Sequence, residues 1–246
     1  SVADEKIQQD KSNFRVFDMQ GGFNSGKASF FHQSLGGYHA AKPKKIQELY
    51  DYQLAKNNYE VFNMLNVKYI LSQDEKGMPV SLENPEVNGN AWFVSEIKTV
   101  ESADALMKAL ETIKTKQTAL VQKGNENLKL STNYIVDSLA TIKLVEAKSN
   151  FLKYETTNKN EGVAVFSEIY YPKGWQISLD GKPAEMFEVD YVLRAMKIPA
   201  GKHTIIFSFE PEVVATGSKI ALMSSIVMVV LIGGGILYCL RRKENE

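Results

Sequence analysis

Residues 220–240 read IALMSSIVMVVLIGGGILYCL and contain no charged side chain. At a helical rise of about 1.5 Å per residue, this stretch spans roughly 30 Å, which matches the hydrocarbon thickness of a bilayer. The alternative is a helix in the core of a soluble protein, but such a helix is rarely apolar on every face. The stretch therefore predicts one transmembrane helix at the C-terminal end of the sequence.

The residues that flank this helix predict its orientation. Lys219 precedes it, whereas Arg241, Arg242 and Lys243 follow it. Cationic residues collect on the cytoplasmic side of a membrane span, so we expect the C-terminus in the cytoplasm and residues 1–214 outside it. The expected location is therefore a plasma membrane. The alternative is a tail-anchored protein with a cytosolic domain, which the basic C-terminal flank opposes.

The first residues, SVADEKIQQD, are polar and include neither an initiator methionine nor a signal peptide. An extracytoplasmic domain needs a preceding segment that carries it across the membrane. We therefore expect the sequence to be part of a longer chain, in which an upstream segment delivers this domain across the membrane.

Composition argues against several kinds of partner and site. Lys plus Arg and Asp plus Glu both number 29, so no net charge attracts nucleic acid, and no nucleic-acid partner is expected. Cys239 is the only cysteine and lies inside the predicted span, so disulfides and cysteine-based metal sites are not expected. No glycine-rich dinucleotide loop follows a predicted strand and no P-loop occurs, so no cofactor is expected.

Helix and strand patterns alternate over residues 1–125. The Gly21–Gly37 stretch is expected to be mostly loop, and Pro43 is expected to open a helix in its first turn. A second short helix is expected around Phe62 and a third after Ser102, which can cap it. Strands are expected at 15–17, 67–71, 90–97 and 119–121. These elements predict a small α/β unit.

From about residue 126 the hydrophobic period changes to two. Alternating apolar residues occur at 140–144, 163–169 and 175–179, and the last run ends in Asp180-Gly181, a strong hairpin signal. A second turn at 199–201 leads into a strand that ends before Pro211. The pattern predicts an antiparallel β-sandwich over residues 126–214, followed by the membrane helix and a short basic tail over 215–246. The predicted fold class is therefore α+β.

No catalytic constellation stands out in the sequence. His32 and His39 are seven positions apart in a glycine-rich segment, which is not the spacing of a helical metal site, and His203 is expected to be an exposed strand residue. No serine lies in a nucleophile-elbow pattern. We therefore predict no catalytic residue and no metal ligand. Trp92 and Trp175 both lie in strand patterns and are expected to pack in the core rather than to stack on sugars.

The least ordinary segment is Gly36–Lys42, which reads GGYHAAK. Paired glycines permit a close approach of the backbone, while Tyr38, His39 and Lys42 provide donors and a titratable ring. These three residues are our candidates for binding a polar ligand at the membrane surface. Alternatively, the segment is a turn whose Tyr38 packs on the following helix.

Five stretches of the chain, in order, are similar to those of one family. They are FHQSLGGYHAAK (31–42), FNMLNVKYI (62–70), GNAWFV (89–94), YPKGW (171–175) and PAGKH (199–203). Together with the final membrane span, they resemble the YfhO-like family of bacterial membrane proteins over essentially the whole sequence.

This resemblance implies a polytopic protein that looks like a GT-C glycosyltransferase. Such enzymes move a sugar from a polyprenyl-phosphate carrier to an acceptor outside the cytoplasm. In Gram-positive members the implied acceptor is a cell-wall polymer such as lipoteichoic acid; here the envelope glycan or polymer that serves as acceptor stays open. The catalytic carboxylate of GT-C enzymes lies in a loop between the first spans, so the resemblance places it upstream of this sequence.

Two classes of function follow. In the first, the chain is the C-terminal region of a GT-C-like glycosyltransferase, where it covers the active site or helps to hold the acceptor. In the second, it is a non-catalytic, membrane-tethered module for binding or assembly in the cell envelope. A membrane-anchored hydrolase is poorly supported, because no acid/base pair or nucleophile is evident.

Overall fold

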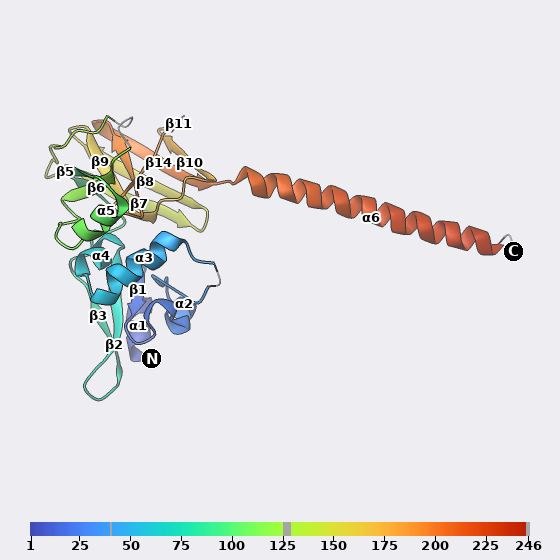
Figure 1. The fold of residues 1–246 in the computed structure, drawn as a ribbon, viewed down its shortest axis with the longest axis horizontal. Coiled ribbons are helices and arrows are strands. Elements are labelled where there is room, and N and C mark those ends of the chain that lie inside the picture. The colour runs from blue at the N-terminus through green and yellow to red at the C-terminus, as the bar shows by residue number, and fades with distance from the viewer. Residues whose placement is uncertain (40, 125–128, 245–246) are drawn as a thin grey trace.

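The computed structural model describes residues 1–39, 41–124 and 129–244. A soluble part of mixed helices and sheets is followed by the long helix α6 (Glu212–Glu244), which points away from it (Figure 1). Among the described residues, one helix is long and apolar enough to cross a membrane, over Glu212–Tyr238. The predicted α+β class with a C-terminal membrane helix is thus confirmed.

A three-stranded sheet lies at the N-terminal end of the soluble part. Its order is β1-β2-β3, with β1 parallel to β2 and β2 antiparallel to β3. The strands are β1 (Arg15–Asp18), β2 (Val67–Gln73) and β3 (Pro79–Glu83). The helices near it are α1 (Val2–Gln9), α2 (Gly26–Phe31), α3 (Lys44–Tyr52) and α4 (Tyr59–Met64), with 3-10 turns η1 (Gly22–Asn24) and η2 (Leu54–Lys56). Pro43 is the N-cap of α3, one position before the predicted first turn.

The Gly21–Gly37 stretch is not mostly loop, contrary to the prediction, because it contains η1 and α2. Ser25 is the reason. Its hydroxyl accepts a hydrogen bond from the Ala28 amide at 3.2 Å, which caps α2, and donates one to the Asp18 carboxylate at 2.6 Å. A serine that caps a helix of only two turns is easily overlooked among glycines.

The predicted strand at 90–97 is in fact two strands in different sheets. β4 (Ala91–Val94) pairs with β9, whereas β5 (Glu96–Val100) runs parallel to β6 (Thr118–Gln122), with α5 (Ala103–Ala109) between them. The chain changes partner at Ser95, whose amide donates to the carbonyl of Gln117 at 2.9 Å. Ser102 caps α5 as predicted.

The C-terminal strands form two antiparallel sheets that pack face to face. The sheets have the orders β12-β13-β9-β4 and β11-β10-β14-β8-β7. Between them, the rings of Tyr154, Phe166 and Phe207 meet edge to face at centroid distances of 4.9 to 6.0 Å. The strands are β7 (Thr141–Lys148), β8 (Phe151–Asn158), β9 (Gly162–Ile169), β10 (Trp175–Leu179), β11 (Lys182–Pro183), β12 (Phe187–Val189), β13 (Leu193–Ile198) and β14 (Gly201–Phe209).

The four-stranded sheet is covered on both faces. On β9, Ala164 and Phe166 face the other sheet, while Val163 and Val165 join a second core with helices α3, α4 and α5. Both halves of the chain thus share apolar contacts, and β4 comes from the first half. The two-unit division predicted at residues 125 and 126 falls on residues outside the described ones and stays a proposal.

The strand β14 leads almost directly into α6. Phe209 is the last residue of β14, and the helix begins at Glu212. The Glu210 amide donates to the Gly174 carbonyl at 2.7 Å, and the rings of Trp175 and Phe209 lie 5.2 Å apart. The stretch at 171–175 therefore holds the junction between the sandwich and the membrane helix.

Candidate functional site

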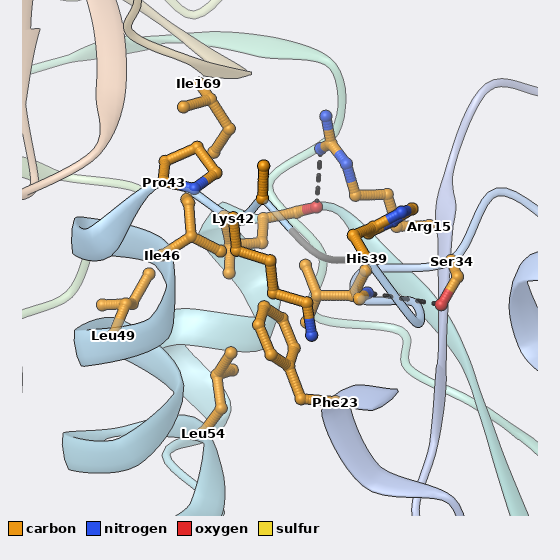
Figure 2. Close-up of a pocket in the computed structure, with 14 residues that line it drawn as sticks. Arg15, Phe23, Ser34, His39, Lys42, Pro43, Ile46, Leu49, Leu54 and Ile169 are labelled. Carbon is orange, nitrogen blue, oxygen red and sulfur yellow. Dashed lines mark hydrogen bonds between the residues drawn. The ribbon is translucent and has the colours of Figure 1, made fainter. Parts of the chain in front are cut away.

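A cavity of about 330 Å³ lies between α3 and the segment that precedes it (Figure 2). Its walls are mostly apolar, and its size is at the lower end of the range for small-molecule sites. The apolar lining residues are Phe23, Leu35, Ile46, Leu49, Leu54, Leu65 and Ile169. They come from η1, α3, η2, the end of α4 and β9, so the cavity forms only in the folded chain.

Gly36 allows the segment before α3 to lie against η1 and so to form one wall of the cavity. A Cβ atom at this position would lie 2.1 Å from the carbonyl oxygen of Phe23, so no larger residue fits without a shift of the backbone. The next amide, of Gly37, donates to that same carbonyl at 2.7 Å. The paired glycines predicted to permit a close approach therefore bring this segment against η1.

The segment before Gly36 is attached to the edge of β1. The Val16 amide donates to the carbonyl of Gln33 at 2.8 Å, and the Leu35 amide donates to the carbonyl of Val16 at 2.9 Å. These two bonds hold Leu35 beside the cavity. The opposite wall is part of the core, because Leu49 and Leu54 are at most 2% exposed.

His39 and Lys42 both line the cavity. His39 is exposed and Lys42 is half-buried, so both lie toward the open side of the cavity. The Lys42 ammonium lies 4.5 Å from the ring centroid of Phe23 and donates to the side-chain oxygen of Asn24. The cavity thus combines an apolar interior with a cation and an imidazole at its opening. Such a site suits an amphiphilic molecule with an apolar portion and an anionic or hydroxylated head.

Tyr38, the third candidate, is not among the lining residues. Its side chain is 87% exposed, so it does not pack on α3 as the alternative interpretation expected. The structure therefore brings two of the three predicted residues to one cavity and leaves Tyr38 facing outward. Their role in binding stays a proposal.

Arg15 is a lining residue that sequence reasoning missed. Its guanidinium donates to the carbonyls of Leu65 at 2.9 Å and Ser167 at 2.6 Å, and pairs with the Glu168 carboxylate at 3.1 Å. With its donors so engaged, Arg15 joins the N-terminal sheet to β9 and holds the cavity wall. The one feature of the sequence that could have pointed to Arg15 is its position as a charged residue at the start of an apolar strand.

The other two histidines each have a carboxylate partner. His32 lies 3.0 Å from Asp4, with a side chain only 3% exposed. His203 was expected to be exposed, but its side chain is 15% exposed because its ring contacts the Asp180 carboxylate at 2.7 Å across the turn. The positive φ angles of Asp180 and Gly181 confirm the predicted hairpin turn. Among the described residues, no group of three potential metal ligands occurs.

Trp92 packs inside the fold, as predicted, whereas Trp175 is partly buried against the core of the sandwich. Trp92 is 6% exposed and donates to the Thr115 carbonyl at 2.9 Å. Trp175 lies against the buried guanidinium of Arg194, 4.5 Å from the ring centroid. The guanidinium lies over the indole ring, and Trp175 also lines a surface hollow with Gln176 and Ile177.

Residues 107–221, slightly less than half of the chain, match the family model described as bacterial membrane protein YfhO. This range runs from α5 through both sheets into the start of α6 and includes the stretches at 171–175 and 199–203. No curated protein and no solved structure matches the chain. The family match over residues 107–221 confirms the resemblance seen in the sequence, and together with the apolar helix α6 it supports a membrane protein.

Proposed function

We propose that this chain is the C-terminal extracytoplasmic region and last span of a GT-C-like glycosyltransferase, which uses a polyprenyl-phosphate-linked sugar to modify an envelope acceptor. The observation that supports the proposal is the apolar cavity with Lys42 and His39 at its open side. The residues that perform the chemistry are expected upstream, in the loops between the first spans. The task of this region is to hold substrate and exclude water.

The chemistry of the cavity fits part of such a substrate. A polyprenyl phosphate has an apolar chain and an anionic head, and the cavity has apolar walls and a cation within reach of its opening. Its volume accommodates only part of a long chain. We therefore propose that the cavity holds the end of the carrier near its phosphate, or the matching portion of a lipid-linked acceptor.

The proposed topology places the soluble part outside the plasma membrane and the C-terminal tail in the cytoplasm. The basis is the cluster Arg241–Lys243 after the span, against Lys219 alone before it. With this orientation the cavity faces the compartment in which polyprenyl-linked sugars are used.

A cavity-filling variant tests the proposal. Ile46→Trp adds an indole to the cavity wall, whereas Val145→Trp adds the same side chain at a half-exposed site on β7. We expect Ile46→Trp to lower transfer of labelled sugar from a polyprenyl-phosphate donor to the envelope fraction by tenfold or more, in membranes that contain the full-length protein. Val145→Trp should leave transfer unchanged.

The controls separate three outcomes. Thermal unfolding checks that both variants fold, and equal transfer by folded Ile46→Trp and the parent would exclude the cavity from substrate binding. Absence of transfer by the parent, together with loss of envelope components from the membrane when the gene is deleted, would favour the alternative of a binding or assembly module.

A further inference from the structure

Three large aromatic side chains are exposed on one stretch of the soluble part. Phe30 is 81% exposed, Phe31 47% and Tyr38 87%. We call these three residues the aromatic edge. They lie on α2 and on the segment that leads from α2 to α3. Exposed aromatic residues at this density are unusual on a surface that faces only water.

The packing of the fold does not explain why these aromatic rings are exposed. α2 is fixed by Ala28, which is fully buried, and by the Ser25 hydroxyl that joins its N-terminus to Asp18. Phe30 and Phe31 point away from this anchor and contact each other edge to face, at 4.8 Å between centroids. Phe31 also lies beside the His32 ring, at 6.4 Å between centroids, whereas Phe30 contacts little besides Phe31 and is free to contact something else.

The position of α6 indicates what they contact. The helix begins at Glu212, directly after Pro211, and Phe209 is still part of the sheet, so the soluble part is held close to the membrane that α6 enters. Figure 1 shows α2 and the connection to α3 on the side of the soluble part from which α6 leaves. The elements that carry the aromatic edge therefore lie on the side of the soluble part that is nearest this bilayer.

The charges around the aromatic edge fit a lipid headgroup layer. The side chain of Lys27 on α2 is 46% exposed and pairs with Asp4 at 3.7 Å, and that of Lys44 at the start of α3 is 89% exposed and pairs with Glu48 at 3.2 Å. Aromatic rings prefer the interface between hydrocarbon and water, and lysines are attracted to anionic headgroups. An amphipathic segment with both features lies in the plane of the interface.

We propose that α2 and the segment that follows it dock onto the headgroup layer of the membrane that α6 crosses, with Phe30, Phe31 and Tyr38 inserted at the interface. The docking goes beyond the proposed function and does not depend on sugar transfer. It sets the opening of the cavity, where Lys42 lies, at the level of the headgroups. A lipid-linked ligand then reaches the cavity without leaving the bilayer.

Nitroxide labels on the full chain test this docking. In a Cys239→Ser background, single cysteines replace Phe30, Tyr38 or Leu82; the last is a matched control, an apolar residue 55% exposed on β3. The labelled chains are placed in nanodiscs of phosphatidylethanolamine and phosphatidylglycerol. Power saturation then measures the access of oxygen, which concentrates in lipid, and of a water-soluble nickel chelate.

We expect labels at positions 30 and 38 to be reached by oxygen in preference to the chelate, and the label at position 82 to show the reverse. All three sites are exposed, so the labels leave the fold intact, which thermal unfolding against the unlabelled parent verifies. Equal access of the chelate to positions 30, 38 and 82 would overturn the proposal. Shielding of positions 30 and 38 from both reagents would also overturn it, because a protein partner would then cover them.

Discussion

Asp190 is a carboxylic acid with no solvent exposure, in the turn between β12 and β13. Its amide donates to the carbonyl of Leu120 at 2.9 Å, and its Oδ1 accepts from the amide of Leu120 at 2.8 Å. None of the described residues hydrogen-bonds its Oδ2. Burial raises the pKa of Asp190 to about 7, only partly offset by the bond from Leu120. The residue therefore links β6 to the sandwich and titrates near neutral pH.

This raised pKa predicts how stability depends on pH. An unfolded aspartate has a pKa of about 3.9, so between roughly pH 4 and pH 7 the folded chain keeps a proton that the unfolded chain has lost. The free energy of unfolding therefore falls as pH rises through this window and levels off above it, by about 4 kcal/mol in total from this group.

Asp190→Asn removes this titration while it keeps an acceptor for the Leu120 amide. We expect the stability of the variant relative to the parent to increase from pH 5 to about pH 7 and to level off above it, as measured by denaturant unfolding of the full chain in detergent micelles. Asp51→Asn, at an exposed site on α3, is the control and should show no such trend. A pH-independent difference between Asp190→Asn and the parent would contradict the assignment.

At the scale of elements, Gly174 determines how β10 and α6 meet. Its φ of +88° is in the left-handed region, and a Cβ atom would lie 2.9 Å from both the Phe209 ring and the Cβ of Pro211. Glycine is therefore required for two independent reasons, one of backbone conformation and one of space.

Gly174→Ala should destabilise this junction by about 1–3 kcal/mol, the usual cost of a strained backbone position. Hydrogen exchange should show faster exchange of the Glu210 amide, which donates to Gly174. Gly181→Ala is the matched control, because φ there is +77° but no atom lies within 4 Å of the added Cβ. If both variants lose the same stability, strain alone explains the effect and the contact with Pro211 contributes nothing.

At the scale of the whole molecule, the shared core predicts how the soluble part unfolds. Val163 and Leu193 of the sandwich lie in the same apolar cluster as Leu49 and Leu106 of the helices. None of the residues of α6 is in a described core cluster. We expect residues 1–210 to fold alone and to unfold in one transition, with coincident changes in far-UV circular dichroism and tryptophan fluorescence. Two separate transitions would instead support independent units.

Sequence patterns predicted the long, regular parts of this molecule well. Period-two alternation located β9 and β10, and the uncharged run located α6, because each pattern reports burial along a single element. The patterns failed where a partner far along the chain decides the outcome. Ser95 separates β4 from β5 because of its bond to Gln117, and His203 is covered because Asp180 lies across the turn. Likewise, Arg15 and Ile169 meet at the cavity only through tertiary contacts between β1 and β9.

The central position of β14 in its five-stranded sheet has a mechanical consequence. The strand is bonded to β10 on one side and to β8 on the other, and it continues into α6 after two residues. A joint this short transmits torque. We therefore expect a change in the tilt or axial rotation of the membrane helix to turn the whole sandwich with it, so that the orientation of the soluble part depends on bilayer thickness and lateral tension.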